Sequence, residues 1–142
     1  MLTSPAPLLV VISAIVALAI TGNLLDASPY VIAAQAVAVT LSVWARRSFP
    51  KNTFRVAAAP GASSIIRRGP YRFVRHPMYS AALLFIWAAI LSHSSPWTLT
   101  LGVMVTLVVS FRLIAEERLL RTRYSEYGEY ARSTKALIPF VL

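Results

Sequence analysis

The chain has 142 residues, of which 57% are apolar and 13% charged, and its 14 Lys and Arg against 5 Asp and Glu give a net charge of +9. Soluble domains carry about 25% charged residues, and so short a chain leaves much of its surface uncovered. The composition therefore excludes an ordinary soluble domain and predicts that lipid surrounds the apolar surface. The lack of cysteine excludes disulfides, thiol catalysis and zinc–thiolate sites.

The charges are confined to two regions of the chain. Residues 1–45 hold only Asp26 and residues 77–111 hold none, so all 14 Lys and Arg lie within 46–75 and 112–135. Cytoplasmic loops of membrane proteins retain Lys and Arg, and two spans between the clusters would place both on one side. This distribution predicts an integral membrane protein of a prokaryotic cytoplasmic membrane, with one domain over 1–142, both termini cytoplasmic and no nucleic acid partner.

Two apolar segments precede the first basic cluster. Residues 8–25 end in the turn-forming run Asn23–Pro29, and residues 30–45 are closed by Arg46 and Arg47. A spanning helix takes about 20 residues, with about 17 as the lower limit, so the second segment is short for a span. A cleaved signal peptide is the alternative for the first segment. No Lys or Arg precedes Arg46, which favours a retained span.

A long connection, residues 46–76, leads to two further apolar segments at 77–92 and 97–115. The connection contains the stretch Ala57–Ser64, rich in Ala and Ser, and is expected to lie on the lipid headgroups. His93–Pro96 predicts a tight turn between the two segments, with His93 exposed and without a partner. Four spans are expected in all.

Residues 116–135 are expected to continue the last span into water, because no Pro occurs between Val103 and Tyr130. Tyr124, Tyr127 and Tyr130 recur at every third position, which is typical of an interfacial helix when charged residues lie between them. The predicted fold class is an all-α membrane protein with about four transmembrane helices and a C-terminal interfacial amphipathic helix.

The turn from Gly69 to Tyr79 places polar and basic side chains directly before an apolar helix. Pro77 suits the first position of that helix, where its missing N–H costs nothing. The free N–H groups and positive dipole end of the helix then lie beside Arg75 and His76, which predicts an anion site. A basic anchor with interfacial aromatic residues is the alternative, and it accounts better for the arginines than for His76 and Tyr79.

Glu116 and Glu117 lie one turn beyond the apolar part of the last span. Neighbouring helix positions point about 100° apart, so the two carboxylates cannot serve one ligand equally. Their spacing from Arg112 and Arg121 predicts surface ion pairs of little energy. The alternative is that one carboxylate turns inward, toward a cationic or hydroxyl-bearing ligand beside His76.

Tyr127, Tyr130 and Arg132 are candidates for the substrate side of the site. Each tyrosine either anchors the helix at the interface or lines a lid over the site. The sequence has no Gly-rich nucleotide fingerprint, no P-loop and no His-x-x-x-His pair. Its two histidines are predicted on opposite membrane faces, so no metal site is expected.

These residues resemble integral-membrane methyltransferases of the isoprenylcysteine carboxyl methyltransferase and phospholipid methyltransferase type. The shared pattern is Gly-x-Tyr-x-x-x-Arg-His-Pro-x-Tyr at Gly69 to Tyr79, then Glu-Glu-x-x-Leu from Glu116 to Leu120. An aromatic residue, Tyr-x-x-Tyr and a terminal Ile-Pro follow at Tyr124, Tyr127, Tyr130, Ile138 and Pro139. The resemblance covers residues 65–140 or so.

The resemblance implies an enzyme that uses S-adenosylmethionine without a Rossmann fold. It implies methyl transfer to a lipidic or small hydrophobic acceptor, whose nucleophile is a carboxylate, an amine or a similar group. The reaction is expected at the cytoplasmic membrane face, with membrane lipid as the partner. Glu116 and Glu117 are the catalytic candidates. The implied cofactor-binding residues are Tyr71, Arg75, His76, Pro77, Tyr79, Glu116 and Glu117.

Two other functions stay open at this point. NADPH-dependent reductases of the sterol reductase type have a similar Arg-His-x-x-Tyr turn, but they resemble one another in an Asn before that Tyr, where this chain has Met78, and in an Asp/Cys-containing segment downstream. A non-enzymatic membrane subunit would use the basic clusters only for topology and contact with anionic lipid. The sequence does not define the acceptor or the oligomeric state.

Overall fold

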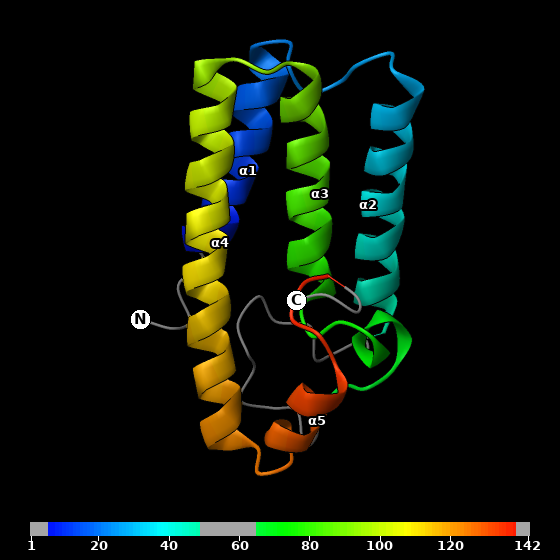
Figure 1. The fold of residues 1–142 in the computed structure, drawn as a ribbon, viewed down its shortest axis with the longest axis vertical. Helices are drawn as coiled ribbons and strands as arrows, with labels where there is room; N and C mark the ends of the chain where they lie inside the picture. Colours follow the sequence, from blue (N-terminus) through cyan, green and yellow to red (C-terminus); the bar gives the residue numbers. More distant parts are fainter. Residues whose placement is uncertain (1–5, 49–64, 139–142) are drawn as a thin grey trace.

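The computed structural model describes residues 6–48 and 65–138, and every regular element within these ranges is helical, as predicted (Figure 1). Residues 49–64 of the predicted connection, and Pro139, lie outside the described residues. The helices are α1 (Ala6–Ile20), α2 (Pro29–Arg47), the 3-10 helix η1 (Gly69–Arg72), α3 (Pro77–Ser92), α4 (Pro96–Arg123) and α5 (Tyr127–Ser133).

Three of the long helices begin at a proline, namely Pro29, Pro77 and Pro96. Proline at this position gives up only an N–H that has no partner within the helix. Before α4, the Ser95 hydroxyl accepts from the Thr98 N–H and the Thr98 hydroxyl accepts from the Ser95 N–H, a reciprocal cap. Pro77 is such a local signal for α3, and this helix has the predicted bounds of 77 and 92.

Helix α1 ends at Ile20, earlier than the predicted residue 25. Gly22 has a φ of +71°, and the Asn23 N–H donates to the Leu18 carbonyl at 2.8 Å while the Gly22 N–H donates to the Ala19 carbonyl at 3.1 Å. These bonds close the helix in a left-handed glycine cap. The prediction extended the helix because Leu24 and Leu25 are apolar, whereas the backbone turns at the glycine.

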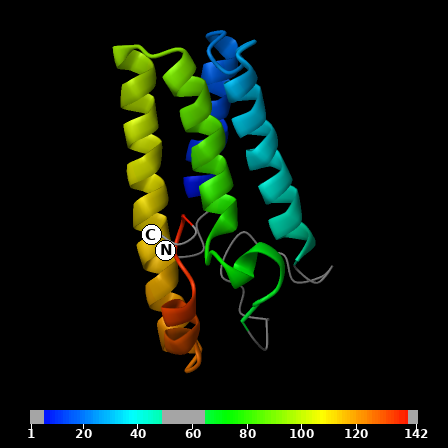
Figure 2. The ribbon, with the colours of Figure 1, turned by 45° about the vertical axis from the view of Figure 1, so that its right-hand side comes forward.

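Helix α3 is the central element of the bundle. It lies between α2 and α4, and α1 packs against both α3 and α4 (Figure 1). Figure 2 shows the same order from a second direction. The core is formed by small and branched apolar residues of α1, α3 and α4: Ala14, Leu18, Ile86, Ala89, Ile90, Val105 and Val109.

The contact between α3 and α4 depends on Gly102. A Cβ atom there would lie 2.7 Å from Ile90 Cδ1 and 3.1 Å from the Trp87 ring, so only glycine lets the helices approach this closely without a shift. Trp87 Nε1 donates to Thr106 Oγ1 at 3.0 Å, which satisfies both polar groups inside an apolar bundle.

Helix α4, with 28 residues, is the one helix of the described ranges that is long and apolar enough to cross a membrane. Helices α1 and α3 are apolar but have 15 and 16 residues. The expectation of four spans and of cytoplasmic termini therefore stays a prediction.

The chain does not continue as one helix over 116–135. Helix α4 ends at Arg123, Tyr124 is extended with φ −120° and ψ 113°, and α5 folds back toward the start of α3 (Figure 1). Tyr127 and Tyr130 are 1% and 4% exposed, so these two rings pack inside the protein and do not anchor the helix, while the interfacial position of α5 stays a prediction. Burial of two aromatic rings against the rest of the chain outweighs continuation of the helix.

The opposite end of the bundle also differs from the prediction. His93 was predicted to have no partner, but its Nε2 lies 3.8 Å from Asp26 Oδ2. The Ser92 hydroxyl donates to the same carboxylate, and the Ser28 N–H donates to Asp26 Oδ1 at 2.6 Å. Asp26 thus connects the loop after α1 to the end of α3.

Candidate functional site

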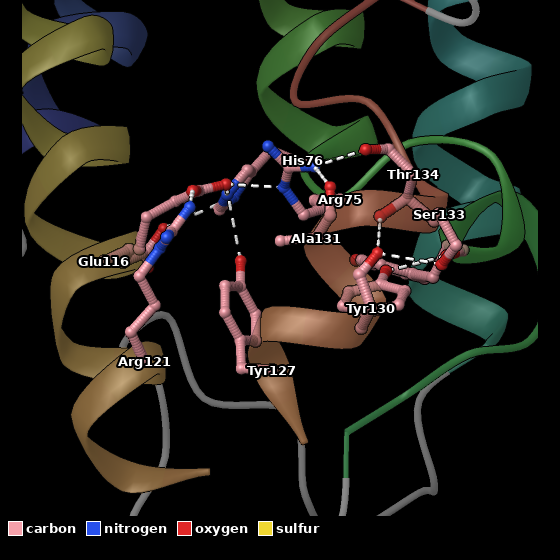
Figure 3. Close-up of polar contacts among 11 residues, drawn as sticks. Arg75, His76, Glu116, Arg121, Tyr127, Tyr130, Ala131, Ser133 and Thr134 are labelled. Atoms are coloured by element: carbon pink, nitrogen blue, oxygen red, sulfur yellow. Dashed lines mark hydrogen bonds and ion pairs between the residues drawn. The ribbon is translucent and has the colours of Figure 1, made fainter. Parts of the chain in front are cut away.

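The turn before α3 and the far end of α4 meet through an ion pair. Arg75 Nε lies 2.6 Å from Glu117 Oε1, and the two side chains are only 12% and 13% exposed (Figure 3). A charged pair removed from water in this way needs hydrogen bonds to its remaining polar atoms. The surrounding contacts show where those bonds are made.

The segment after α5 supplies the remaining partners of Arg75. Arg75 Nη1 donates to the Ala131 carbonyl at 2.8 Å and also to the Thr134 carbonyl. The main chains pair as well, because the Arg75 N–H donates to the Lys135 carbonyl at 2.7 Å and the His76 N–H to the Ala136 carbonyl at 3.1 Å. Residues 134–138 therefore form one wall of the site. This wall was not predicted, since an extended segment of this kind has no periodic sequence signal.

His76 is buried between the two glutamates. Its Nδ1 lies 3.8 Å from Glu116 Oε2, and its Nε2 lies 3.4 Å from Glu117 Oε1. Its ring stacks on Tyr79 with the centroids 5.7 Å apart. Within the described ranges, Nε2 has no hydrogen bond of good geometry although it is buried. Such a group is a candidate for contact with a ligand, because buried polar atoms are rarely left unpaired.

Glu117 is the most firmly held acid of the site. Besides Arg75, its Oε1 accepts from the Tyr127 hydroxyl at 3.4 Å, and its Oε2 lies 3.5 Å from Arg121 Nη2. The close His76 imidazole lowers the pKa of Glu117 most and Arg75 adds to this, so that the pKa falls to about 2 although burial acts in the opposite direction. Glu117 is therefore an anion that takes up protons only in strong acid.

Glu116 faces a different set of side chains. Its Oε1 lies 3.5 Å from Arg112 Nη2, and Tyr79 is an electrostatic neighbour of both residues. Arg112 is buried, so the Arg112–Glu116 pair is not the surface pair that the spacing predicted. Arg112 was missed as a site residue because helix spacing alone does not distinguish a buried face from an exposed one.

The anion site predicted at the start of α3 has fewer backbone donors than expected. The Tyr79 and Ser80 N–H groups both donate to the His76 carbonyl at 3.1 Å, and Pro77 has no N–H. In the first turn of α3 this leaves the Met78 N–H as the donor without a hydrogen bond among the described residues. The Ser80 hydroxyl donates to the Leu137 carbonyl and ties the last described residues to the same turn.

The predicted tyrosines form a packed layer beneath the ion pair. The Tyr130 hydroxyl donates to the Tyr71 carbonyl at 2.7 Å, and the Tyr127 and Tyr130 rings meet edge to face at 5.8 Å. Burial raises the pKa of Tyr130 to about 12 and raises the pKa values of Tyr71 and Tyr127 as well. These phenols stay neutral. Arg132 is exposed on α5 and is not brought to this cluster.

Residues 26–127 match the family model described as phospholipid methyltransferase, a stretch that includes α2, α3 and α4. The cobalt-zinc-cadmium resistance protein CzcN of Cupriavidus metallidurans is 32% identical over 83 residues, which are 54% of this chain and 36% of that protein. The matched part is thus little more than a third of the length of CzcN. No solved structure matches.

Proposed function

Because the chain belongs to the phospholipid methyltransferase family, we propose that it transfers a methyl group from S-adenosylmethionine to a lipidic or small hydrophobic acceptor at the cytoplasmic membrane face. Membership of the family supports methyltransferase activity on membrane substrates. The single observation that carries the proposal is the convergence of His76, Tyr79 and the two glutamates at one end of an apolar bundle.

Four membrane spans are part of this proposal. Large apolar side chains of the outer helices are exposed, and a soluble chain rarely leaves so much apolar surface in water. They include Leu9, Val16, Ile20, Ile32, Val37, Val39, Met104, Leu107 and Phe111. The short helices α1 and α3 would match the apolar layer through interfacial residues at their ends, and the site would then lie at the basic, cytoplasmic surface.

The residues of the site fit such a cofactor. S-adenosylmethionine carries a carboxylate, an ammonium group and a sulfonium cation. The Met78 N–H offers a donor that the described residues leave unused, and the buried Nε2 of His76, 3.4 Å from Glu117 Oε1, makes no hydrogen bond of good geometry. Glu116 offers a negative charge to a cationic group, and the Tyr79 ring offers a face to the sulfonium. These four residues would hold the cofactor.

When bound, S-adenosylmethionine would supply a methyl group carried on a sulfonium sulfur. The acceptor attacks the methyl carbon in line with the carbon–sulfur bond, and the sulfur leaves as a neutral thioether. Such a displacement requires alignment and exclusion of water more than acid–base groups. Helices α3 and α4 provide the rigid frame for this alignment. If the acceptor is an amine, a base must accept its proton. One of the two glutamates is the candidate base, and the pKa of about 2 makes Glu117 a weak one.

Cofactor binding is the direct test of the proposed function. The detergent-solubilised protein is titrated with S-adenosylmethionine, with its demethylated product and with NADPH, and thermal stability is followed. The proposal expects stabilisation by the first two compounds and none by NADPH. Stabilisation by NADPH alone would support the reductase alternative, and no response to any of the three would support a non-enzymatic subunit.

The acceptor requires a second experiment. A labelled-methyl assay against a lipid extract, followed by separation of the labelled products, would identify the acceptor class. The proposal expects label in a lipid or small hydrophobic product, and label found only in water-soluble products would contradict it.

A further inference from the structure

We propose that the corner where α2 ends beside η1 binds the phosphate of an anionic phospholipid. The α2–η1 corner consists of Arg47 at the end of α2, Arg68 directly before η1 and Arg72 at the end of η1. All three side chains are exposed. The inference goes beyond methyl transfer and rests only on the proposed position of the protein in the membrane.

The two segments of the corner are held together by a hydrogen bond and by close packing (Figure 1). Arg68 Nε donates to the Ser48 carbonyl at 2.8 Å, which fixes this guanidinium at the last turn of α2. A Cβ atom added to Gly69 would lie 3.3 Å from Trp44 Nε1, so η1 begins directly against α2. Arg68 and Arg47 therefore belong to one surface, although they come from different segments.

No carboxylate balances the positive charge of the corner within the described ranges. The sequence contains no Asp or Glu between Asp26 and Glu116. Of the later acids, Glu126 pairs with Arg67 at 3.4 Å, and Glu116 and Glu117 are engaged beside His76. The three arginines of the corner form no ion pair with any of them. The corner is thus a local excess of positive charge.

The end of α2 supplies an opposing partial charge. The C-terminal end of a helix carries about half a negative charge on its carbonyl groups. The Ser48 N–H donates to the Trp44 and Ala45 carbonyls at 3.2 Å, and Arg68 covers the Ser48 carbonyl. Three guanidinium charges outweigh what remains of this partial charge, so the corner attracts an anion.

The guanidinium groups of the corner have donors to spare. Among the described residues, Arg68 donates through Nε alone, and Arg47 makes no hydrogen bond with its side chain. The Arg72 guanidinium lies over the Phe73 ring, 5.8 Å from its centroid. This contact uses the face of the group and leaves its N–H groups available. A guanidinium fork matches the oxygens of a phosphate, which identifies the class of anion.

Exposed apolar side chains beside the corner indicate that the phosphate belongs to a lipid. Trp44 and Phe73 are 49% and 48% exposed, and Val39 and Val43 are exposed on the same helix as Trp44. Helix α2 lies at the edge of the bundle with α3 on its inner side (Figures 1 and 2). Aromatic residues are typical of the headgroup level, and basic clusters at the end of a span attract anionic lipid. The acyl chains would then lie along α2.

The test compares two lipids with the same acyl chains. The full chain in detergent is titrated with dioleoyl phosphatidylglycerol, which is anionic, and with dioleoyl phosphatidylcholine, which is zwitterionic, and bound lipid is counted by native mass spectrometry. We expect phosphatidylglycerol to bind about tenfold more tightly or better. The difference should shrink as the salt concentration rises, because salt screens exposed charges. Equal affinities for the two lipids would overturn the proposal.

Two double variants with the same net charge locate the site. Arg47→Gln/Arg72→Gln removes two charges of the corner, and Arg118→Gln/Arg123→Gln removes two exposed charges from the far part of α4. Each basic residue beside an anionic lipid contributes about fivefold in affinity, so the first variant should bind phosphatidylglycerol about 25-fold more weakly. The second should change by less than about threefold. Equal losses would assign the preference to net charge and overturn the site.

A soluble phosphate is distinguished from a lipid by competition. Glycerol 3-phosphate carries the phosphate without acyl chains, and in excess it should not displace phosphatidylglycerol from the unmodified protein. Displacement would assign the corner to a soluble anion and overturn the lipid. The Tm of each variant in phosphatidylcholine shows that it is folded. None of these measurements uses methyl transfer, so a protein that fails to bind S-adenosylmethionine can still select phosphatidylglycerol, and loss of that selection leaves the proposed reaction unaffected.

Discussion

Arg75 connects three parts of the molecule through one guanidinium. It contacts Glu117 of α4 and the carbonyls of Ala131 and Thr134, and its own main chain pairs with Lys135. The sequence interpretation placed Arg75 among the cofactor-binding residues. Its Nε and Nη1 donors are instead used within the chain, which indicates a structural task for most of the side chain.

Arg75→Lys tests this task. Lysine keeps the positive charge but has no planar group that could reach the carboxylate and the carbonyls together. We expect the free energy of unfolding to fall by about 1–3 kcal/mol, the range for hydrogen bonds to charged groups that leave a buried partner unsatisfied. Arg47→Lys at the exposed end of α2 is the matched control and should change stability by less than about 0.5 kcal/mol. Equal losses in the two variants would contradict the assignment.

The low pKa of Glu117 predicts a loss of stability in acid. The pKa is about 2 in the folded protein and 4.5 ordinarily, so the unfolded chain takes up the proton first. The contribution of Glu117 is therefore complete above about pH 4.5 and is lost as the pH falls toward about 2, on the order of 3 kcal/mol in total. Acid unfolding monitored by circular dichroism should show this loss in the unmodified protein and a smaller one in Glu117→Gln. The same slope in both would rule out Glu117 as its source.

The sequence predicted the chemistry-bearing residues better than their partners. His76, Tyr79, Glu116 and Glu117 meet at one place, as the motif spacing implied. The burial of Arg112 and the carbonyl ligands of Arg75 were not predicted. Both depend on which segments pack together. Every residue has a main-chain carbonyl, so the sequence does not show which carbonyls accept from Arg75.

At the scale of elements, the connection into the site turns at Gly69. This residue has a φ of +61°, and a Cβ atom there would overlap the Ser48 hydroxyl at the end of α2. That hydroxyl already donates to the Trp44 carbonyl at 2.9 Å. The turn that leads into η1 is therefore fitted tightly against α2.

Gly69→Ala and Gly22→Ala form a matched pair of variants. Both glycines have positive φ, which costs an alanine about 1–2 kcal/mol. Gly22 has no atom within 4 Å of its would-be Cβ, so its variant should lose only that amount. Gly69→Ala should lose clearly more, because Ser48 must also move. Thermal unfolding of the two variants measures the difference in stability. Equal losses would show that Ser48 moves away from the new Cβ atom at little cost in free energy.

Element boundaries were predictable where local signals define them. Pro77 and the run His93–Pro96 contain caps and turns that act within a few residues. Helix α5 was not predictable in this way. The sequence between Arg123 and Tyr127 allows a helix to continue. The reversal is stabilised by burial of Tyr127 and Tyr130 and by the hydrogen bond from Tyr130 to the Tyr71 carbonyl, 59 positions away.

For the whole molecule, the proposed orientation in the membrane has a direct test. The chain has no cysteine, so single-cysteine variants report on one position each. Ser94 and Ser125 are exposed at opposite ends of α4. In intact bacterial cells, a membrane-impermeant maleimide should label Ser94→Cys, and it should label Ser125→Cys only after the membrane is opened. Labelling of both in intact cells, or the reverse order, would contradict four spans with a cytoplasmic site.

The pairing of residues 73–76 with 134–138 determines when the site can form during synthesis of the chain. Helices α1 to α4 precede the last partner of the Arg75 guanidinium in the order of synthesis, and that partner, Thr134, lies 59 positions further along the chain. The four helices are therefore synthesised first, and the wall of the site is missing until residues 134–138 have emerged. A nascent chain that has completed α1 to α4 therefore lacks this wall until residues 134–138 have been added.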